Sequence, residues 1–159
     1  MFLGKQVRMK RLLGPSGRLL AITMDHPITR GNLPGLIDIR GTMKKIVAGR
    51  PDAITIQKGI AERVFPPYAG EVALIMKSTP YQVPYHATYD TPLADVEEAV
   101  RLGADAISVG CIVGGPEQAQ QLTHLARIAK DAGSAGMPLI AHIYPKGSMI
   151  KDQHDANHH

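Results

Sequence analysis

Tryptophan is absent from this 159-residue sequence, and phenylalanine and tyrosine together make up only 4% of it. A hydrophobic core must therefore be built from aliphatic side chains, which the 44% hydrophobic content can supply. A single cysteine, Cys111, excludes an internal disulfide bond and is typical of a reducing compartment. We expect Cys111 to be a small buried hydrophobic residue rather than a reactive thiol.

Long apolar runs are also lacking: none approaches the roughly 20 residues that a membrane-spanning helix needs, so we expect no membrane partner. The first residues carry no apolar segment or cleavage site typical of a signal peptide, and we expect a cytoplasmic protein. The net charge of +4 comes without a dense basic stripe or interleaved aromatics, which argues against nucleic acid. A mildly basic chain is compatible with a small anionic substrate.

Neither a Gly-x-Gly-x-x-Gly motif nor a Walker A loop occurs, and we expect no cofactor. Three histidines, His154, His158 and His159, lie close together near the end of the chain. We interpret them as part of a solvated tail, so no metal site is predicted.

Five short apolar runs recur, each bounded by turn residues, at residues 18–24, 52–57, 71–76, 105–113 and 138–143. They are nearly continuous in Val, Ile, Leu and Ala and do not alternate with polar residues. That pattern is typical of parallel strands buried on both faces.

Helical patterns separate several of these runs. One begins with Thr91 as its N-cap and Pro92 at its first position, presents Leu93, Val96 and Val100 on one face, and ends before a glycine at position 103. Another begins at residues 115–116. The apolar face predicted for this second helix consists of Leu122, Leu125, Ala126, Ala129 and Ala132.

Other connections are less regular. A looser helix is expected over residues 37–48, whereas residues 59–70 look too short for a helical crossover. Residues 80–90 hold three of the five tyrosines in a segment interrupted by proline, and we expect a binding loop there.

Two α/β architectures accept five parallel strands: a flavodoxin-like doubly wound sheet and part of a (β/α)8 TIM barrel. A doubly wound sheet needs a closing helix after its last strand, but only twelve polar residues follow Gly147. We therefore predict one domain over residues 1–159, a TIM barrel truncated after strand five.

Active sites of parallel β/α folds form at the carboxyl ends of the strands. Asp25 follows the first strand and can act as a general base, or else cap a helix or pair with a loop cation. His26 can bind substrate by hydrogen bonds or remain an ordinary loop histidine. Tyr144, at the end of the last strand, can donate a proton to a developing alkoxide or lie on the rim with its hydroxyl in water.

Three lysines also follow strands. Lys58 and Lys77 are each candidates for a nucleophilic amine, which would require desolvation or a nearby cation, but strand-end lysines more often bind phosphate or pair with a carboxylate. Lys146 is better suited to contact an anion.

The segments around these strand ends resemble motifs of a known family. The segments GRLLAITMDHP, DVEEAVRLG followed by ADAISVGCIVGG, and GMPLIAHIYPKG resemble the archaeal-type class I aldolases, over about residues 4–152. That family includes fructose-bisphosphate aldolases and 2-amino-3,7-dideoxy-threo-hept-6-ulosonate synthases. The resemblance implies a TIM barrel that acts on phosphorylated sugars through a Schiff base.

The resemblance also implies roles for individual residues. Asp25 matches the acid/base aspartate, Tyr144 the proton-donor tyrosine, Lys146 a substrate-contacting position, and Lys58 the lysine of a Lys-Gly pair after strand two. Pro27 departs from the pattern, because the family has glycine there. The family's Schiff-base lysine ends strand six and its phosphate cradle follows strands seven and eight, and no lysine of this chain matches the nucleophile.

The sequence therefore predicts a class I aldolase for a phosphorylated ketose or related keto sugar, inactive as this portion alone. Alternatives are a catalytically silent sugar-phosphate-binding half-barrel and, more weakly, a flavodoxin-like regulatory domain. Because the first and fifth strands would each expose an edge, and because related barrels assemble, we expect a homo-oligomer.

Overall fold

The computed structural model describes residues 2–80, 90–147 and 150. The connecting segment between positions 81 and 89 and the three C-terminal histidines, for which a binding loop and a solvated tail are predicted, lie outside the described residues. In chain order the elements are Leu3–Leu13 (α1), Ala21–Thr23 (β1), His26–Arg30 (α2), Pro34–Leu36 (η1), Ile39–Ala48 (α3), Ala53–Gln57 (β2), Lys58–Val64 (α4), Pro66–Tyr68 (η2), Ala73–Lys77 (β3), Val96–Arg101 (α5), Ala106–Val113 (β4), Gln118–Ser134 (α6) and Leu139–Pro145 (β5).

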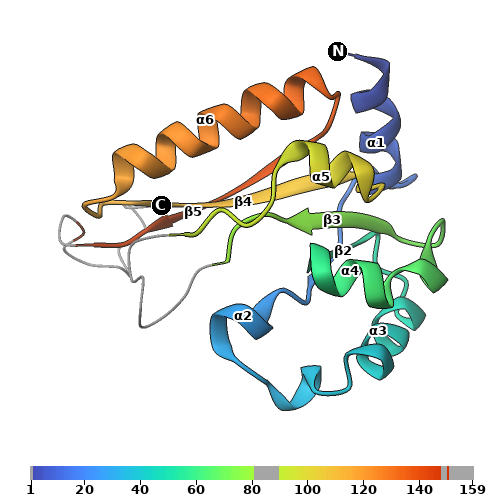
Figure 1. Ribbon diagram of the computed structural model, residues 1–159. Helices are drawn as coiled ribbons and strands as arrows, with labels where there is room; N and C mark the ends of the chain where they lie inside the picture. The colour runs from blue at the N-terminus through green and yellow to red at the C-terminus, as the bar shows by residue number, and fades with distance from the viewer. Residues whose placement is uncertain (1, 81–89, 148–149, 151–159) are drawn as a thin grey trace.

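The five strands form one parallel sheet in the order β1-β2-β3-β4-β5, and each strand pairs with the next one in the chain (Figure 1). A flavodoxin-like sheet would place its first strand between the second and the third. The sequential order excludes that alternative and confirms the first five β/α units of a (β/α)8 barrel.

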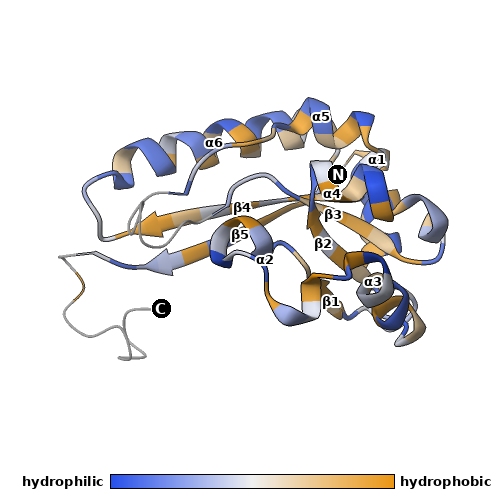
Figure 2. Ribbon diagram, turned by 60° about the horizontal axis from the view of Figure 1, so that its bottom comes forward, coloured by the Kyte–Doolittle hydropathy of each residue, from blue (hydrophilic) through white to orange (hydrophobic). Residues whose placement is uncertain are grey.

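One face of the sheet packs against the helices. Ile54, Leu74, Met76, Ile107 and Val109 project from β2, β3 and β4 into a single apolar cluster, completed by side chains of α3 to α6. Figure 2 shows the hydrophobic residues concentrated along these central strands, with hydrophilic stretches along α6.

The other face is the inner side of the barrel. Near the amino ends of the strands it carries the small or aliphatic side chains Ala53, Ala73, Ile75 and Ala106, packed with Leu12 of α1. Every residue of β2 and β3 is buried, as the continuous apolar runs predict, whereas β1 and β5 are only partly buried. These two strands lie at the ends of the sheet, so each has one neighbouring strand among the described residues.

The helix α1 was not predicted from the sequence. Arg8 Nη1 donates a hydrogen bond to the Gly136 carbonyl oxygen (2.9 Å), and Arg11 Nη1 lies 3.1 Å from Asp105 Oδ1. Two of the four basic side chains near the N-terminus therefore dock α1 against the residues that precede β4 and β5. They hold the fold together at the end opposite the strand termini where a ligand is expected.

Helix boundaries required several corrections. Thr91 and Pro92 do not start a helix: α5 begins at Val96, because Asp95 forms a capping box in which Glu98 N donates to Asp95 Oδ1 (2.8 Å) and Asp95 N donates to Glu98 Oε2 (3.3 Å). The connection over residues 59–70, predicted to be too short for a helical crossover, holds η2 and all of α4 except its first residue, so it does cross over through helix.

The predicted apolar faces were also partly wrong. In α5 the buried residues are Val96 and Ala99, whereas Val100 is exposed, as is Leu93, which precedes the helix. In α6, Gln121, Ile128 and Ala132 are buried and Leu125 packs against them, which leaves Leu122, Ala126 and Ala129 on the solvent side. Gln121 was missed because a polar residue was not expected in the core; its Oε1 accepts a hydrogen bond from Ile112 N (2.7 Å).

The capping box gives a direct test of the corrected α5 boundary. We expect Asp95→Ala to lower the free energy of unfolding by about 1 kcal/mol, because Glu98 N loses its acceptor. Asp95→Ser retains a capping oxygen and should lose much less. Urea denaturation followed by circular dichroism measures both, and equal losses would contradict a capping role.

Candidate active site

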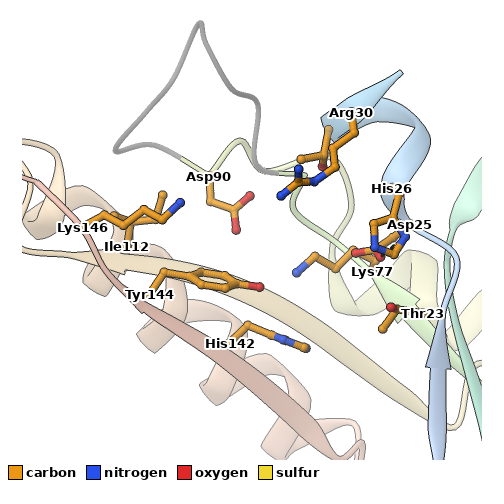
Figure 3. Close-up of a pocket in the computed structure, with 11 residues that line it drawn as sticks. Thr23, Asp25, His26, Arg30, Lys77, Asp90, Ile112, His142, Tyr144 and Lys146 are labelled. Carbon is orange, nitrogen blue, oxygen red and sulfur yellow. Dashed lines mark ion pairs between the residues drawn. The ribbon is translucent and has the colours of Figure 1, made fainter. Parts of the chain in front are cut away.

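A cavity of about 330 Å³ opens at the carboxyl ends of the strands, and residues from every strand unit except β2 contribute to it. Its lining consists of Thr23, Asp25, His26, Thr29, Arg30, Lys77, Asp90, Ile112, His142, Tyr144 and Lys146. Four of the five site residues predicted from the sequence, Asp25, His26, Tyr144 and Lys146, are therefore brought together, as Figure 3 shows.

The short helix α2 positions the residues that follow β1. Pro27 lies in its first turn, and Gly31, with φ of 73°, ends it by donating its N–H to the Pro27 carbonyl oxygen (2.9 Å). The single turn so formed directs Asp25, His26 and Arg30 to the cavity. Proline at this position, where the resemblance implied glycine, is compatible with the turn because proline suits the start of a helix.

Asp25 occupies the N-cap position of α2, but its side chain makes no capping hydrogen bond. Its Oδ1 lies 4.0 Å from Nδ1 of His26. Asp25 therefore holds the cap position without a capping hydrogen bond, its nearest ionisable partner is the neighbouring His26, and it lines the cavity.

Tyr144 and His142 project from β5 on the same side, two residues apart, with ring centroids separated by 6.3 Å and planes inclined by 20°. Burial raises the pKa of the Tyr144 hydroxyl, and the carboxylates of Asp90 and Asp25 raise it further. Burial, followed by the Lys77 charge, lowers the pKa of His142, against a smaller opposing effect of Asp25. At neutral pH Tyr144 therefore keeps its proton and His142 is an uncharged imidazole.

Of the two lysines considered as nucleophiles, Lys58 and Lys77, it is Lys77 that lines the cavity. It is only 6% exposed at the end of β3, and burial lowers its pKa, although the nearby charges of Asp90 and Asp25 act in the opposite direction. Desolvation of this kind favours the unprotonated amine that a nucleophilic lysine requires.

Lys58 does not line this cavity. Its Nζ lies 2.6 Å from Oε1 of Glu98 on α5, and this contact contributes to lowering the pKa of Glu98. The register explains the difference, because Gln57 pairs with Lys77 and their side chains share the inner face, so that Lys58, one residue later, points the other way.

Asp90 was missed by the sequence analysis. Its carboxylate is 3% exposed, and its Oδ2 accepts a hydrogen bond from Thr79 Oγ1 (3.1 Å), which in turn accepts one from Gly110 N (2.6 Å). Its Oδ1 is buried with no hydrogen-bond donor among the described residues. The available signal was its place at the end of the proline-interrupted segment 80–90.

Burial raises the pKa of Asp90 to about 6, and Asp25 adds to this, while the Lys77 charge and the Thr79 hydrogen bond lower it. Thr79 is held close to Gly110, where a side chain in place of the glycine hydrogen would overlap the Asp90 carboxylate. The orientation of Asp90 is therefore fixed by its neighbours.

The charges suit an anionic, hydroxylated ligand. Arg30, Lys77 and Lys146 face two carboxylates, Asp25 and Asp90, in the same cavity. The described residues include no group of three His, Cys, Asp or Glu side chains that could hold a metal ion. Nor does any helix in the described ranges combine the length and apolar content needed to cross a bilayer.

Cys111 is fully buried, as predicted. Burial, with a smaller effect of Asp90, raises the pKa of its thiol, and this keeps the reactive thiolate scarce at neutral pH.

Comparisons with known proteins agree with the motifs. Residues 19–158 match the family model described as DeoC/LacD family aldolase. The 2-amino-3,7-dideoxy-D-threo-hept-6-ulosonate synthase of Halobacterium salinarum is 40% identical over 158 residues, which cover 96% of this chain and 57% of that protein. Synthase 1 of the same name from Archaeoglobus fulgidus is 31% identical, over 92% of this chain and 56% of that protein.

Solved structures agree as well. A Schiff-base-forming fructose-1,6-bisphosphate aldolase superposes with a TM-score of 0.82 at 25% identity, and an archaeal fructose-1,6-bisphosphate aldolase with its catalytic lysine bound to a carbinolamine intermediate does so with 0.78 at 26%. Each alignment covers 94% of this chain and 61% of the other. The chain thus spans somewhat over half the length of the proteins it matches, and it belongs to the DeoC/LacD family of aldolases.

Proposed function

We propose that the protein is a class I aldolase, which reversibly cleaves a carbon–carbon bond of a phosphorylated ketose or related keto sugar. This chain contributes the proton-transfer residues and part of the substrate cavity. The observation that carries the proposal is the convergence of Asp25 and Tyr144 on one cavity with three cationic side chains.

In this proposal a lysine amine on a sixth strand, beyond the five of this chain, forms an iminium with the substrate ketone and accepts the electrons of the breaking bond. Tyr144, protonated at neutral pH because its pKa is raised, acts as the proton donor. Asp25 acts as the complementary acceptor, and the uncharged His142 ring supports Tyr144 from the same strand.

The anionic group of the substrate would be bound at the rim. Lys146 follows β5 and Arg30 ends α2, and both line the cavity and are more exposed than Lys77. Lys77, deeper and nearly buried, would bind a substrate carbonyl or hydroxyl oxygen between the two carboxylates. His26 would contribute a further hydrogen bond beside Asp25.

Among the relatives, the synthase of Halobacterium salinarum gives the more specific substrate. Its name describes a seven-carbon keto acid with an amino group at carbon 2 and the ketone at carbon 6. Aldol cleavage next to such a ketone separates the three carbons that hold the ketone from a four-carbon aldehyde that holds the amine and carboxylate. We propose that this chain accepts an amino-acid aldehyde of that kind, because identity with this relative is higher than with the fructose-bisphosphate aldolases.

We expect the isolated chain to bind a small ketose phosphate without forming a stable adduct. Dihydroxyacetone phosphate, titrated by NMR, should bind about tenfold more weakly to Lys146→Ala, because one charge-assisted contact of about 1.4 kcal/mol is lost. Lys130→Ala, which removes an exposed lysine of α6, serves as the matched control. Equal affinities of the two variants would contradict an anion contact at Lys146.

Borohydride reduction tests where the nucleophile resides. With dihydroxyacetone phosphate and sodium borohydride, the mass of the chain should remain unchanged, since no lysine matches the family's nucleophile. That result agrees with a nucleophile on a later strand. It agrees equally with the silent half-barrel alternative, which would be favoured if Tyr144 and Asp25 proved dispensable in an enzyme that includes the later strands. A reduced adduct on Lys77, absent from Lys77→Met, would overturn the assignment of the nucleophile to a later strand.

The raised pKa of Asp90 predicts a pH-dependent stability. Between pH 3.8, where the unfolded carboxyl ionises, and about 6, where the folded one does, the folded state holds more protons, so stability falls as pH rises. Relative to wild type, Asp90→Asn should therefore gain up to about 3 kcal/mol on going from pH 4 to pH 8, measured by urea denaturation. Asp131→Asn, at an exposed site on α6, should show no such trend, and a constant difference for Asp90→Asn would contradict the shift.

A further inference from the structure

One carboxylate in the cavity has no part in the chemistry proposed above. Asp90 is 3% exposed, lines the cavity and keeps Oδ1 buried without a donor among the described residues. Buried polar atoms nearly always have a hydrogen-bond partner, and a buried ionised oxygen without one is costly. An atom of this kind inside a binding cavity indicates that a ligand supplies the missing donor.

The orientation of the Asp90 carboxylate is fixed by Thr79 and Gly110. Thr79 Oγ1 donates to Oδ2 and is itself held by Gly110 N, while the absence of a side chain at Gly110 gives the carboxylate its space. With Oδ2 engaged, only Oδ1 remains to receive a ligand group. Figure 3 shows the carboxylate directed into the space above the Tyr144 ring, with Arg30 and Lys146 lining the same cavity.

A positively charged donor fits this oxygen better than a neutral one. The Lys77 charge acts on Asp90, but Lys77 donates no hydrogen bond to Oδ1. A substrate ammonium would supply that bond in its stronger, charge-assisted form. Arg30 and Lys146 line the same cavity and are opposite in charge to the carboxylate of such a ligand.

We propose that Asp90 is the specificity-determining residue that selects an amino-bearing acceptor, with its Oδ1 receiving the substrate ammonium. This inference deepens the proposed function and rests on it for the class of substrate. Asp90 acts in recognition and takes no proton from the reacting atoms. The carboxylate thereby favours an α-amino acid aldehyde over an uncharged sugar aldehyde of the same length.

Two stable ligands that differ in a single group provide the test. L-homoserine carries an ammonium where (S)-2,4-dihydroxybutyrate carries a hydroxyl, and both retain the carboxylate and the terminal oxygen. In NMR titrations of the full chain at neutral pH, followed through the Gly110 amide and its neighbours, homoserine should bind about tenfold more tightly. Asp90→Asn should abolish that preference, while Asp131→Asn should retain it.

The outcomes are decisive in either direction. Equal binding of the two ligands, no binding of homoserine even close to its solubility limit, or a preference that survives in Asp90→Asn would each overturn the proposal. The amide spectrum of each variant confirms that it is folded, and Thr79→Val, which frees Oδ2 while keeping the charge, should reduce the preference without abolishing it. Neither ligand forms a Schiff base, so failure of the aldolase proposal would appear in the ketose phosphate titration and leave this comparison intact.

Discussion

The two-residue alternation of side chains along parallel strands determines which residues reach the cavity. In β2, β3 and β4 alternate positions point toward the helices, and these are the large aliphatic residues of the apolar cluster. The remaining positions point inward, and in β2 and β3 they change along the strand from alanine at the amino end to Gln57 and Lys77 at the carboxyl end. A strand register shifted by one residue would exchange the two sets and would abolish both the core and the site.

Much of this arrangement could be predicted from the sequence. Five continuous apolar runs indicated parallel strands, and the rule that active sites form at carboxyl ends brought Asp25, His26, Tyr144 and Lys146 to one cavity. The choice between Lys58 and Lys77 could not be made, since both follow a strand and only the register shows which one points inward. Alternation along β5 would have identified His142, two residues before Tyr144.

Other features depended on contacts distant in sequence. Arg30 reaches the cavity because α2 is a single turn, and the length of so short a helix has no clear signal in the sequence. Asp90 is buried through Thr79 and Gly110, residues 11 and 20 positions away, and that packing is tertiary. Helix α5 begins after Asp95 and not at the Thr-Pro pair of residues 91–92. Asp95 and Glu98 each accept a hydrogen bond from the other's backbone N–H, and a proline at the start of a helix satisfies neither of these donors.

The helix α1 has a consequence for how the sheet tolerates change. Leu12 packs against the alanine-lined amino ends of the strands, whereas the cavity residues lie at the carboxyl ends. The anchoring contacts and the cavity therefore occupy opposite ends of the same strands. Substitutions in the cavity can alter which ligands bind while α1 continues to hold the strands together.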